Sequence, residues 1–258
     1  MEKVGKIGFF LILLCLSIGY MLFEATTLTI SRFDFPCTTC GNSLKIAVLT
    51  DLHFRKMGSL ENKLQTTLIR ENPDLILIAG DTLDSERSLP VAQTLFSKLN
   101  PRLGILATLG NWENWKNLNS PSLFQSFGTT LLSNESYRAN NDISIYAFDD
   151  LSGDPDTTFV RSRLENKFCI ALVHSPLIFD TIQGICPLVL AGHTHGGQIR
   201  LPFLNPLWLP KGSGKYVSGW YKTKESQLYV SRGIGTSILP LRFFSSPELV
   251  LITLKEKI

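Results

Sequence analysis

The sequence predicts an α/β domain that follows an N-terminal apolar segment. Three observations support this fold class. Apolar runs of strand length alternate with amphipathic segments from Ser43 onward, several of these runs end in side chains that bind metals, and the first 41 residues differ in composition from the rest. Such alternation is typical of sheets whose strands present polar groups at their carboxyl ends.

Composition narrows the class of protein further. The 258 residues are enough for one large domain with a substantial core. With 44% hydrophobic and 18% charged residues the chain is not disordered, and five cysteines are too few for a disulfide scaffold. The 25 Lys and Arg against 22 Asp and Glu give a net charge of +3. This charge is too small to indicate nucleic acid, and we expect no nucleic-acid partner.

The apolar N-terminal segment is predicted to be an uncleaved membrane anchor. The run from Ile7 to Phe23 carries no charge, and a spanning helix needs about 17 to 25 such residues. A cleaved signal peptide is the alternative. However, no small-x-small cleavage site follows the run, and Leu14 precedes Cys15 where a lipoprotein signal has a small residue.

Two regions and a location at the cell membrane follow from this prediction. We expect residues 1–41 to form the anchor and a linker, and residues 42–258 to form the folded domain. The lysines and arginines near the run only slightly favour an N-terminus inside the cell, which would place the domain outside. A helix that lies in the membrane interface is the alternative, and the side of the domain stays open.

Strands and helices alternate through the rest of the chain. Leucines recur at every fourth position within Ser59–Arg70, which predicts one buried helix face. Ser88 with Pro90 predicts the start of a second helix, and Ser175 with Pro176 that of a third. The expected strands are Lys45–Thr50, Asp74–Ala79, Gly104–Leu109, Ile143–Phe148, Phe168–Val173, Pro187–Ala191, Gln227–Ser231 and Glu248–Leu254.

Metal-binding side chains follow five of these runs directly or after one glycine. They are Asp51, Asp81, Asn111, His174 and His193. The four histidines of the chain all lie at such strand ends, and they are His53, His174, His193 and His195. A single histidine at a strand end is more often structural. Here all four histidines of the chain lie at strand ends, together with Asp and Asn, and this combination predicts a site for Mn, Fe or Zn. Seven ligands suggest two ions with a shared bridge, an arrangement that suits displacement at phosphorus.

These motifs resemble those of the calcineurin-like metallophosphoesterases. The matching motifs are DxH at Asp51–His53, GD at Gly80–Asp81, GN at Gly110–Asn111, the lone His174 and GHTH at Gly192–His195. The remainder, to about Leu254, is similar to a bacterial branch of small, often membrane-linked phosphodiesterases. The resemblance implies a four-layer αββα fold, in which two mixed sheets pack face to face with helices outside.

The resemblance also implies a role for each ligand. Asp51, His53 and His195 would hold the first divalent ion. Asn111, His174 and His193 would hold the second, and Asp81 would bridge the two. Asp81, Asn111 and His193 would take part in catalysis through the attacking water. Mn is the expected metal, with Fe and Zn as alternatives.

One position departs from the family pattern. The family usually has histidine after GN, where it helps to stabilise the transition state or to protonate the leaving group, but this chain has Trp112. An indole N–H cannot donate a proton as an acid, which favours a leaving group that departs without one, such as a phosphate. The UDP-2,3-diacylglucosamine hydrolases of lipid A synthesis, relatives by this resemblance, also lack the histidine. Their reaction, which releases UMP and lipid X, is the favoured function.

Several residues carry weaker signals. Arg55, Arg232 and Arg242 are candidate contacts for a substrate phosphate, with simple salt bridges as the alternative. The apolar loop Leu201–Pro210 is expected to pack under another element, to shelter acyl chains or to dip into a bilayer.

The cysteines are expected to be structural. Cys37 and Cys40 form a CxxC pair, for which a redox pair, half of a zinc site and a small disulfide loop are all open. Cys169 and Cys186 lie in apolar runs and are expected in the core.

Three functions remain open. The first is a membrane-anchored hydrolase of a lipid-linked phosphodiester or diphosphate. The second is a phosphodiesterase or phosphatase for soluble substrates, and the third is a weakly active metal-binding scaffold. The full set of seven ligands argues against the scaffold, and the apolar segments favour the first function. The oligomeric state stays open.

Overall fold

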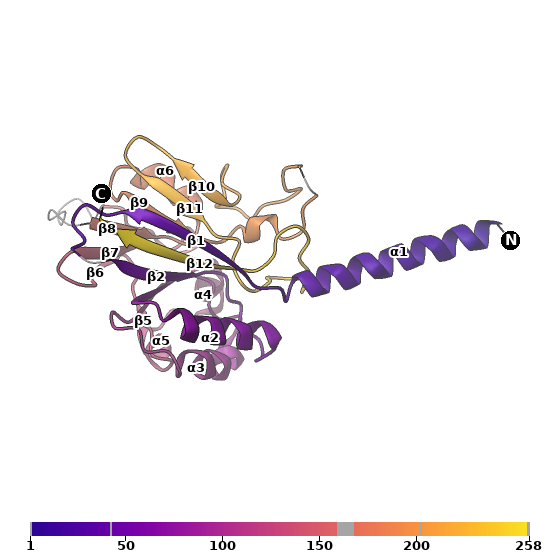
Figure 1. Ribbon diagram of the computed structural model, residues 1–258, viewed down its shortest axis with the longest axis horizontal. Coiled ribbons are helices and arrows are strands. Elements are labelled where there is room, and N and C mark those ends of the chain that lie inside the picture. Colours follow the sequence, from indigo (N-terminus) through magenta and orange to yellow (C-terminus); the bar gives the residue numbers. More distant parts are fainter. Residues whose placement is uncertain (1, 42, 159–167, 202, 257–258) are drawn as a thin grey trace.

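Two mixed six-stranded sheets packed face to face form the centre of the domain (Figure 1). The computed structural model describes residues 2–41, 43–158, 168–201 and 203–256. The first sheet contains, in spatial order, β1 (Thr29–Pro36), β12 (Glu248–Lys255), β2 (Leu44–Leu49), β3 (Leu75–Ala79), β4 (Ile105–Thr108) and β5 (Thr130–Leu131). The second contains β10 (Gly219–Lys222), β11 (Gln227–Val230), β9 (Leu188–Ala191), β8 (Phe168–Leu172), β7 (Ile143–Ala147) and β6 (Glu135–Arg138). All eight expected strands are present.

Most strands at the centre of each sheet pair in parallel, and this determines which loops lie at the same edge of the sheet. Strands β2 to β5 run parallel to one another, as do β7, β8, β9 and β11. Antiparallel pairs occur only towards the edges, between β12 and β2, β10 and β11, and β6 and β7. Because parallel strands end on the same side, the loops that follow β2, β3 and β4 share one edge of the first sheet, and those after β8 and β9 share one edge of the second.

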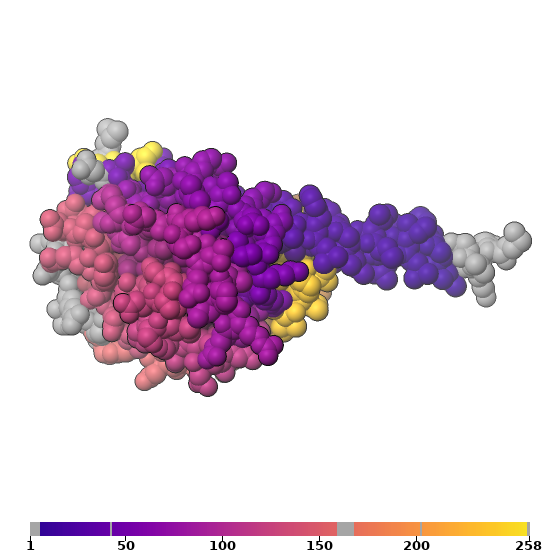
Figure 2. Space-filling model, turned by 90° about the horizontal axis from the view of Figure 1, so that it is seen from below, coloured from indigo at the N-terminus to yellow at the C-terminus, as the bar shows by residue number. Residues whose placement is uncertain are grey.

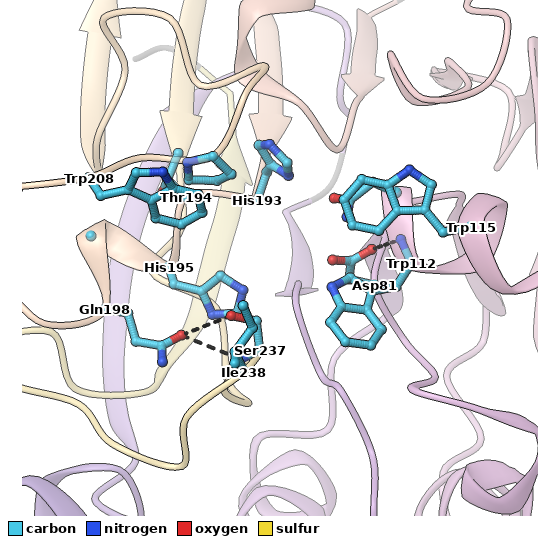
Figure 3. A pocket seen from close by; sticks show the side chains of 13 residues that line it. Asp81, Trp112, Trp115, His193, Thr194, His195, Gln198, Trp208, Ser237 and Ile238 are labelled. Atoms are coloured by element: carbon cyan, nitrogen blue, oxygen red, sulfur yellow. Dashed lines mark hydrogen bonds between the residues drawn. The ribbon is translucent and has the colours of Figure 1, made fainter.

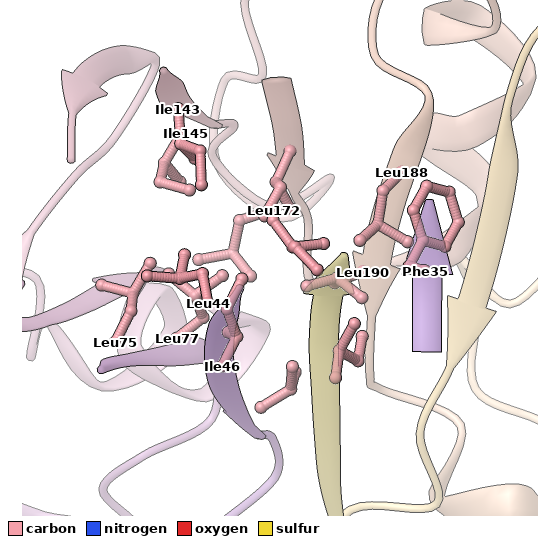
Figure 4. Packing of buried hydrophobic residues seen from close by; sticks show 14 of the residues in the cluster. Phe35, Leu44, Ile46, Leu75, Leu77, Ile143, Ile145, Leu172, Leu188 and Leu190 are labelled. Carbon is pink, nitrogen blue, oxygen red and sulfur yellow. The ribbon is translucent and has the colours of Figure 1, made fainter. Parts of the chain in front are cut away.

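The main core lies between the two sheets (Figure 4). Ile46 and Leu77 of the first sheet pack in the same buried cluster as Ile145, Leu172 and Leu190 of the second. Each of these side chains is at most 1% exposed. Successive side chains of a strand point to opposite faces of the sheet, so every second residue of these strands points into the core between the sheets.

Helices cover the outer faces of the sheets. The leucines of α2 (Ser59–Glu71) are buried against the first sheet together with α3 (Leu89–Phe96), so the leucine spacing is confirmed as a buried helix face. On the second sheet, the segment after Ser175 forms only short turns, Pro176–Ile178 and α6 (Phe179–Ile182). The remaining short helices are Glu86–Ser88, α4 (Asn111–Lys116), α5 (Pro121–Gln125) and His195–Gly197.

A single long helix, α1 (Glu2–Glu24), projects from the domain (Figures 1 and 2). Its segment Lys6–Glu24 is long and apolar enough to cross a membrane, and only 6% of the most apolar stretch is buried. An N-terminal signal sequence has the same length and composition, so the helix is either a signal or an anchor.

Strand β1 lies within the segment that we expected to be a linker. It pairs in parallel with β12, and Phe35 is buried while Phe33 packs on Trp220 and Tyr229. The end of α1 also belongs to the fold, because the carboxylate of Glu24 is buried and accepts hydrogen bonds from three residues: Phe244, Ser245 and Ser246. Charged residues alternate with phenylalanines in β1, as is usual for an edge strand, and this weak pattern hid the strand.

Two disulfides join the four cysteines of the domain. Cys37 pairs with Cys40, which argues against half of a zinc site and agrees with either a small disulfide loop or an oxidised redox pair. Cys169 and Cys186 are buried as expected, and they also form a disulfide, which joins β8 to the segment before β9. Their Cα atoms are 5.2 Å apart, a normal separation for a bridge. The sequence did not reveal this pair because the two apolar runs become neighbours only in the folded sheet.

The position of β1 predicts where the chain can be truncated. A variant that begins at Glu24 should be folded, whereas a variant that begins at residue 42 loses β1 and the buried Phe35. Loss of a buried phenylalanine alone costs about 3 to 5 kcal/mol, which corresponds to a fall in Tm of about 10 °C or more. Thermal unfolding of both purified variants measures this difference, with Phe35→Ala in the longer variant as the control. Equal stability of the two variants would show that β1 is dispensable.

Candidate metal centre

The loops after five strands bring all seven expected metal ligands into one cluster. Strands β2, β3 and β4 of the first sheet and β8 and β9 of the second lead directly into these loops. Each of the seven residues is at most 6% exposed. The cluster consists of Asp51, His53, Asp81, Asn111, His174, His193 and His195.

The backbone turns sharply at most of these positions. Five of the seven residues have positive φ angles, a region that side-chain-bearing residues rarely adopt. They are Asp51, His53, Asp81, His193 and His195. Two glycines allow the loops to approach closely, because a Cβ on Gly110 would collide with Asp81 and one on Gly192 with Thr50 and Asp51. Such conformations persist where the surrounding structure enforces them, which is common at functional sites.

Three ligand atoms converge to form the first half of the centre. The Nε2 atoms of His53 and His195 are 3.3 Å apart, and Nε2 of His195 is 3.4 Å from Oδ1 of Asp51. All three side chains offer atoms within 4.8 Å of one another, as one metal ion requires. Nitrogen and oxygen donors without cysteine fit Mn, Fe or Zn.

Asp81 joins this half to the second. Its Oδ2 atom lies 3.5 Å from Nε2 of His53 and 3.4 Å from Nε2 of His174. The same nitrogen of His174 is 3.1 Å from Oδ1 of Asn111 and 3.2 Å from Nδ1 of His193. Asp81 therefore lies between His53 and His174, and atoms of Asp51, Asp81 and His174 also converge within 4.8 Å of one another.

Hydrogen bonds to the outer ring nitrogens orient three of the histidines. The contacts are His53 Nδ1 to Asp84 Oδ1 at 2.8 Å, His174 Nδ1 to the carbonyl of Ala79 at 2.8 Å and His193 Nε2 to the carbonyl of Lys211 at 2.9 Å. An outer nitrogen that donates to oxygen leaves the inner nitrogen with a free lone pair for a metal. Nδ1 of His195 is buried and has no partner among the described residues.

Burial and neighbouring charges shift the pKa values of several side chains in the cluster. Burial lowers the pKa of His195 well below its usual value, and His53 lowers it further, so this ring is neutral as a ligand must be. Burial alone would lower the pKa of His174, but the carboxylate of Asp81 raises it well above its usual value. Correspondingly, His174 holds the pKa of Asp81 low in spite of burial. A metal that binds between these two groups therefore displaces a proton from His174.

The sequence reasoning missed Glu113, which holds the ligand loops in place. Its fully buried carboxylate accepts four backbone N–H groups, from Gly110, Asp81, Thr82 and Leu83, at 2.6 to 3.1 Å. Burial, followed by the charge of Asp81, raises the pKa of Glu113 to about 7. The available signal was an acidic residue in the first turn of a helix after Gly-Asn, where its carboxylate can accept from the N–H of the N-cap residue Gly110.

A pocket of about 270 Å³ opens beside the ligand cluster. Figure 3 shows Trp112 and Trp115 on one side, with Trp208 and Ile238 across from them. The ring of Trp112 is 5.2 Å from that of His53. Its backbone N–H donates to Oδ1 of Asp81 at 2.9 Å. The walls are therefore mainly aromatic and apolar, and the floor carries the metal ligands.

The three arginines proposed as substrate contacts have structural partners and are absent from the described lining of this pocket. Arg55 pairs with Asp84 and donates to the carbonyls of Thr236 and Ser237. The partners of Arg232 are Ser246, Thr29 and Glu248.

Arg242 is fully buried and donates to the carbonyls of three loop residues: Arg232, Gly235 and Ser245. Burial lowers its pKa to about 10, so the side chain stays charged at neutral pH. It therefore ties together the loops that precede β12.

Comparison with known proteins decides the family. The sequence profile of calcineurin-like phosphoesterases matches residues 44–197, which include all seven ligands. The chain belongs to the calcineurin-like metallophosphoesterase family. It is a metal-dependent phosphoesterase whose ligand cluster fits two metal ions.

Its similarity to bacterial metallophosphoesterases extends over most of the chain. YkuE of Bacillus subtilis, an uncharacterized metallophosphoesterase, is 36% identical over 91% of this chain and 86% of its own. Phosphodiesterase YaeI of Escherichia coli is 29% identical over 81% of this chain and 82% of its own. A dimetal phosphatase from Danio rerio superposes with a TM-score of 0.50 at 9% identity, over 76% of this chain and 89% of that one, and supports the fold alone.

The contacts of Glu113 predict a loss of metal affinity in Glu113→Gln. A glutamine places an amide donor opposite backbone N–H groups, so Asp81 is no longer held in position. We expect metal affinity to fall about 10- to 100-fold and the free energy of unfolding to fall by about 1 to 3 kcal/mol.

Calorimetric titration with Mn²⁺ and thermal unfolding measure both effects. Glu86→Gln is the matched control, because Glu86 is exposed. Unchanged Mn²⁺ affinity in Glu113→Gln would contradict the positioning role.

Asp81→Asn should abolish turnover while it preserves the fold.

Proposed function

We propose that this protein is a membrane-anchored two-metal hydrolase of phosphodiesters or diphosphates whose leaving group is acidic. The observation that carries the proposal is Trp112, which lies in the pocket beside the ligand cluster where the family usually has a histidine. The phosphodiesterase name of the relative YaeI supports the diester class. A protein phosphatase or a nucleotidase for soluble substrates is the second candidate.

The ligands divide into two sets that share one carboxylate. Asp51, His53 and His195 would hold one ion, Asn111, His174 and His193 the other, and Asp81 both. Mn is the metal that we propose first, with Fe and Zn as alternatives. Two such ions, when bound, polarise the phosphoryl oxygens and activate the attacking water. Asp81, Asn111 and His193 would take part in catalysis by holding the ions that activate this water.

The pocket offers little help to a basic leaving group. Apart from the proposed metal ligands, the described residues that line it are tryptophans, small polar residues and apolar residues, none of which is an acid at neutral pH. General acid catalysis is typically worth about 10²- to 10⁴-fold. A phosphate leaves without protonation because its second pKa is about 6, whereas an alkoxide does not.

Apolar walls and α1 favour a lipid-linked substrate over a soluble one. The lipid diphosphate UDP-2,3-diacylglucosamine, which would give UMP and lipid X, fits the leaving-group argument. The two disulfides argue against it, because such bridges persist outside the reducing cytoplasm, where a UDP-linked substrate belongs. We therefore propose that the catalytic domain lies on the extracytoplasmic side and acts on another lipid phosphodiester or diphosphate there.

Leaving-group acidity should govern the rate of hydrolysis. Without an acid, kcat/KM should rise steeply from alkyl through phenyl to nitrophenyl diesters of phosphate. Trp112→His should accelerate the alkyl diesters by about 10-fold or more and change the nitrophenyl diesters little. The measurement compares both proteins with Mn²⁺ over the graded series, and Trp115→His is the matched control. Equal rates for alkyl and nitrophenyl esters would sink the proposed acid-free mechanism.

Thiol counting tests the side of the membrane. Protein isolated from cells under acid quench should expose one thiol to a maleimide reagent, that of Cys15 in α1, since the four other cysteines are in disulfides. After reduction all five should react, and Cys15→Ser should remove the first signal alone. Five reactive thiols before reduction would place the domain in the cytoplasm.

A further inference from the structure

Exposed apolar side chains concentrate at two segments beside the pocket. Phe203 is 101% exposed, Leu207 88% and Ile238 78%. We call the full set the apolar rim, and it consists of Leu201, Phe203, Leu204, Leu207, Trp208, Ile238, Leu239 and Phe244. Pro202 lies outside the described residues. An exposed apolar surface of this kind on a protein marks a site of interaction.

The rim and the pocket share their walls. Trp208 and Ile238 belong to the rim and also line the pocket above the metal ligands (Figure 3). Gln198, another lining residue, donates to the carbonyl of Leu239 at 2.9 Å and accepts from Ser237. Whatever covers the rim therefore also faces the mouth of the pocket.

The rim is also fixed to the end of α1. The rings of Tyr20 and Phe243 meet edge to face at 5.8 Å, and the N–H of Arg242 donates to the carbonyl of Met21 at 3.2 Å. Phe243 in turn accepts from the N–H of Arg200, just before the first rim segment. Figure 2 shows gold-coloured atoms of this C-terminal region directly beside the base of α1.

These contacts keep the rim close to the apolar part of α1. Tyr20 and Met21 lie within the uncharged run, at most four residues before Glu24. At 1.5 Å of rise per residue they are only about 6 Å from the end of the helix. Strand β1 begins at Thr29, so too little chain remains for the domain to move away.

We propose that the rim docks on the bilayer in which α1 is embedded, so that the pocket opens onto the membrane surface and takes the phosphate of a lipid from it. The occupant is the bilayer because the rim continues the exposed apolar surface of α1. Aromatic side chains such as Trp208 and Phe203 suit the interface between acyl chains and headgroups. Exposed Lys211 and Lys215 follow the first rim segment and suit anionic headgroups. The docking rests on the membrane anchor of the proposed function, but it does not depend on the identity of the reaction.

Fluorescence quenching tests the docking directly. Helix α1 contains no tryptophan, so the emission comes from the four tryptophans of the domain. In vesicles of phosphatidylcholine and phosphatidylglycerol, bromine on the acyl chains should quench the full-length protein. Trp208→Phe should remove most of that quenching, and Trp220→Phe should remove little because Trp220 packs against Phe33 and Phe35. Quenching that does not change in Trp208→Phe overturns the proposal.

Rates of hydrolysis provide the second test. The two probes share one leaving group, but one is soluble and the other lies in a membrane. The soluble probe is bis(p-nitrophenyl) phosphate, and the membrane probe is the p-nitrophenyl phosphodiester of dioleoylglycerol in the same vesicles. Phe203→Glu combined with Leu207→Glu should lower hydrolysis of the membrane probe about tenfold or more and leave the soluble probe unchanged. Ile69→Glu is the matched control, since Ile69 is exposed on α2, outside the rim.

The outcomes separate the two proposals. If neither probe is cleaved with Mn²⁺, Fe²⁺ or Zn²⁺, the proposed function fails, and quenching still decides the docking. If the soluble probe is cleaved and the rim variant cleaves the membrane probe at the normal rate, the docking fails. If the rim variant converts a dimer into a monomer without any change in quenching, a second copy of the chain covers the rim, and the docking is again overturned.

Discussion

The burial of two carboxylates beside four imidazoles is the constraint on which the rest of the structure depends. Asp51 and Asp81 are at most 2% exposed, and charges without compensation are costly in such a place. The proton that Asp81 holds on His174 compensates only part of this charge. Divalent cations would supply the remaining positive charge, which is consistent with a dimetal site at this cluster. The backbone turns at the strand ends, the buried carboxylate of Glu113 and the hydrogen bonds to the outer ring nitrogens all keep these donors together.

Much of this centre could be predicted because its signals are local. Each ligand stands at the end of an apolar run, and the direction of parallel strands then places the ligands at a common edge. The helix over Ser59–Glu71 was equally clear, since leucines at every fourth residue define a buried face. What local patterns could not provide was the pairing of distant segments. β1 reads as a linker until its partner β12, more than 200 residues later, is known.

The same limit explains the arginines and the second disulfide. Arg242 looks like a phosphate contact in the sequence, because the sequence contains no sign of the three carbonyls that surround it. Glu113 was overlooked for the opposite reason, since its partners are backbone N–H groups and backbone groups have no identity in a sequence. Cys169 and Cys186 appear as ordinary core residues until the strand β8 and the segment before β9 are placed side by side.

Trp112 links the chemistry of the centre with the surface around it. Under the proposed function, Trp112 stands in place of an acid and favours leaving groups that need no proton. As an indole, it adds to an aromatic wall with Trp115, opposite Trp208. Apolar walls exclude water and strengthen the attraction between bound cations and a phosphate, because the local dielectric constant falls. The same walls continue outward into the apolar rim, which ends at the base of α1. A phosphate held at the floor of the pocket would have its substituent beside these apolar walls, which is the physical reason for proposing a lipid-linked substrate.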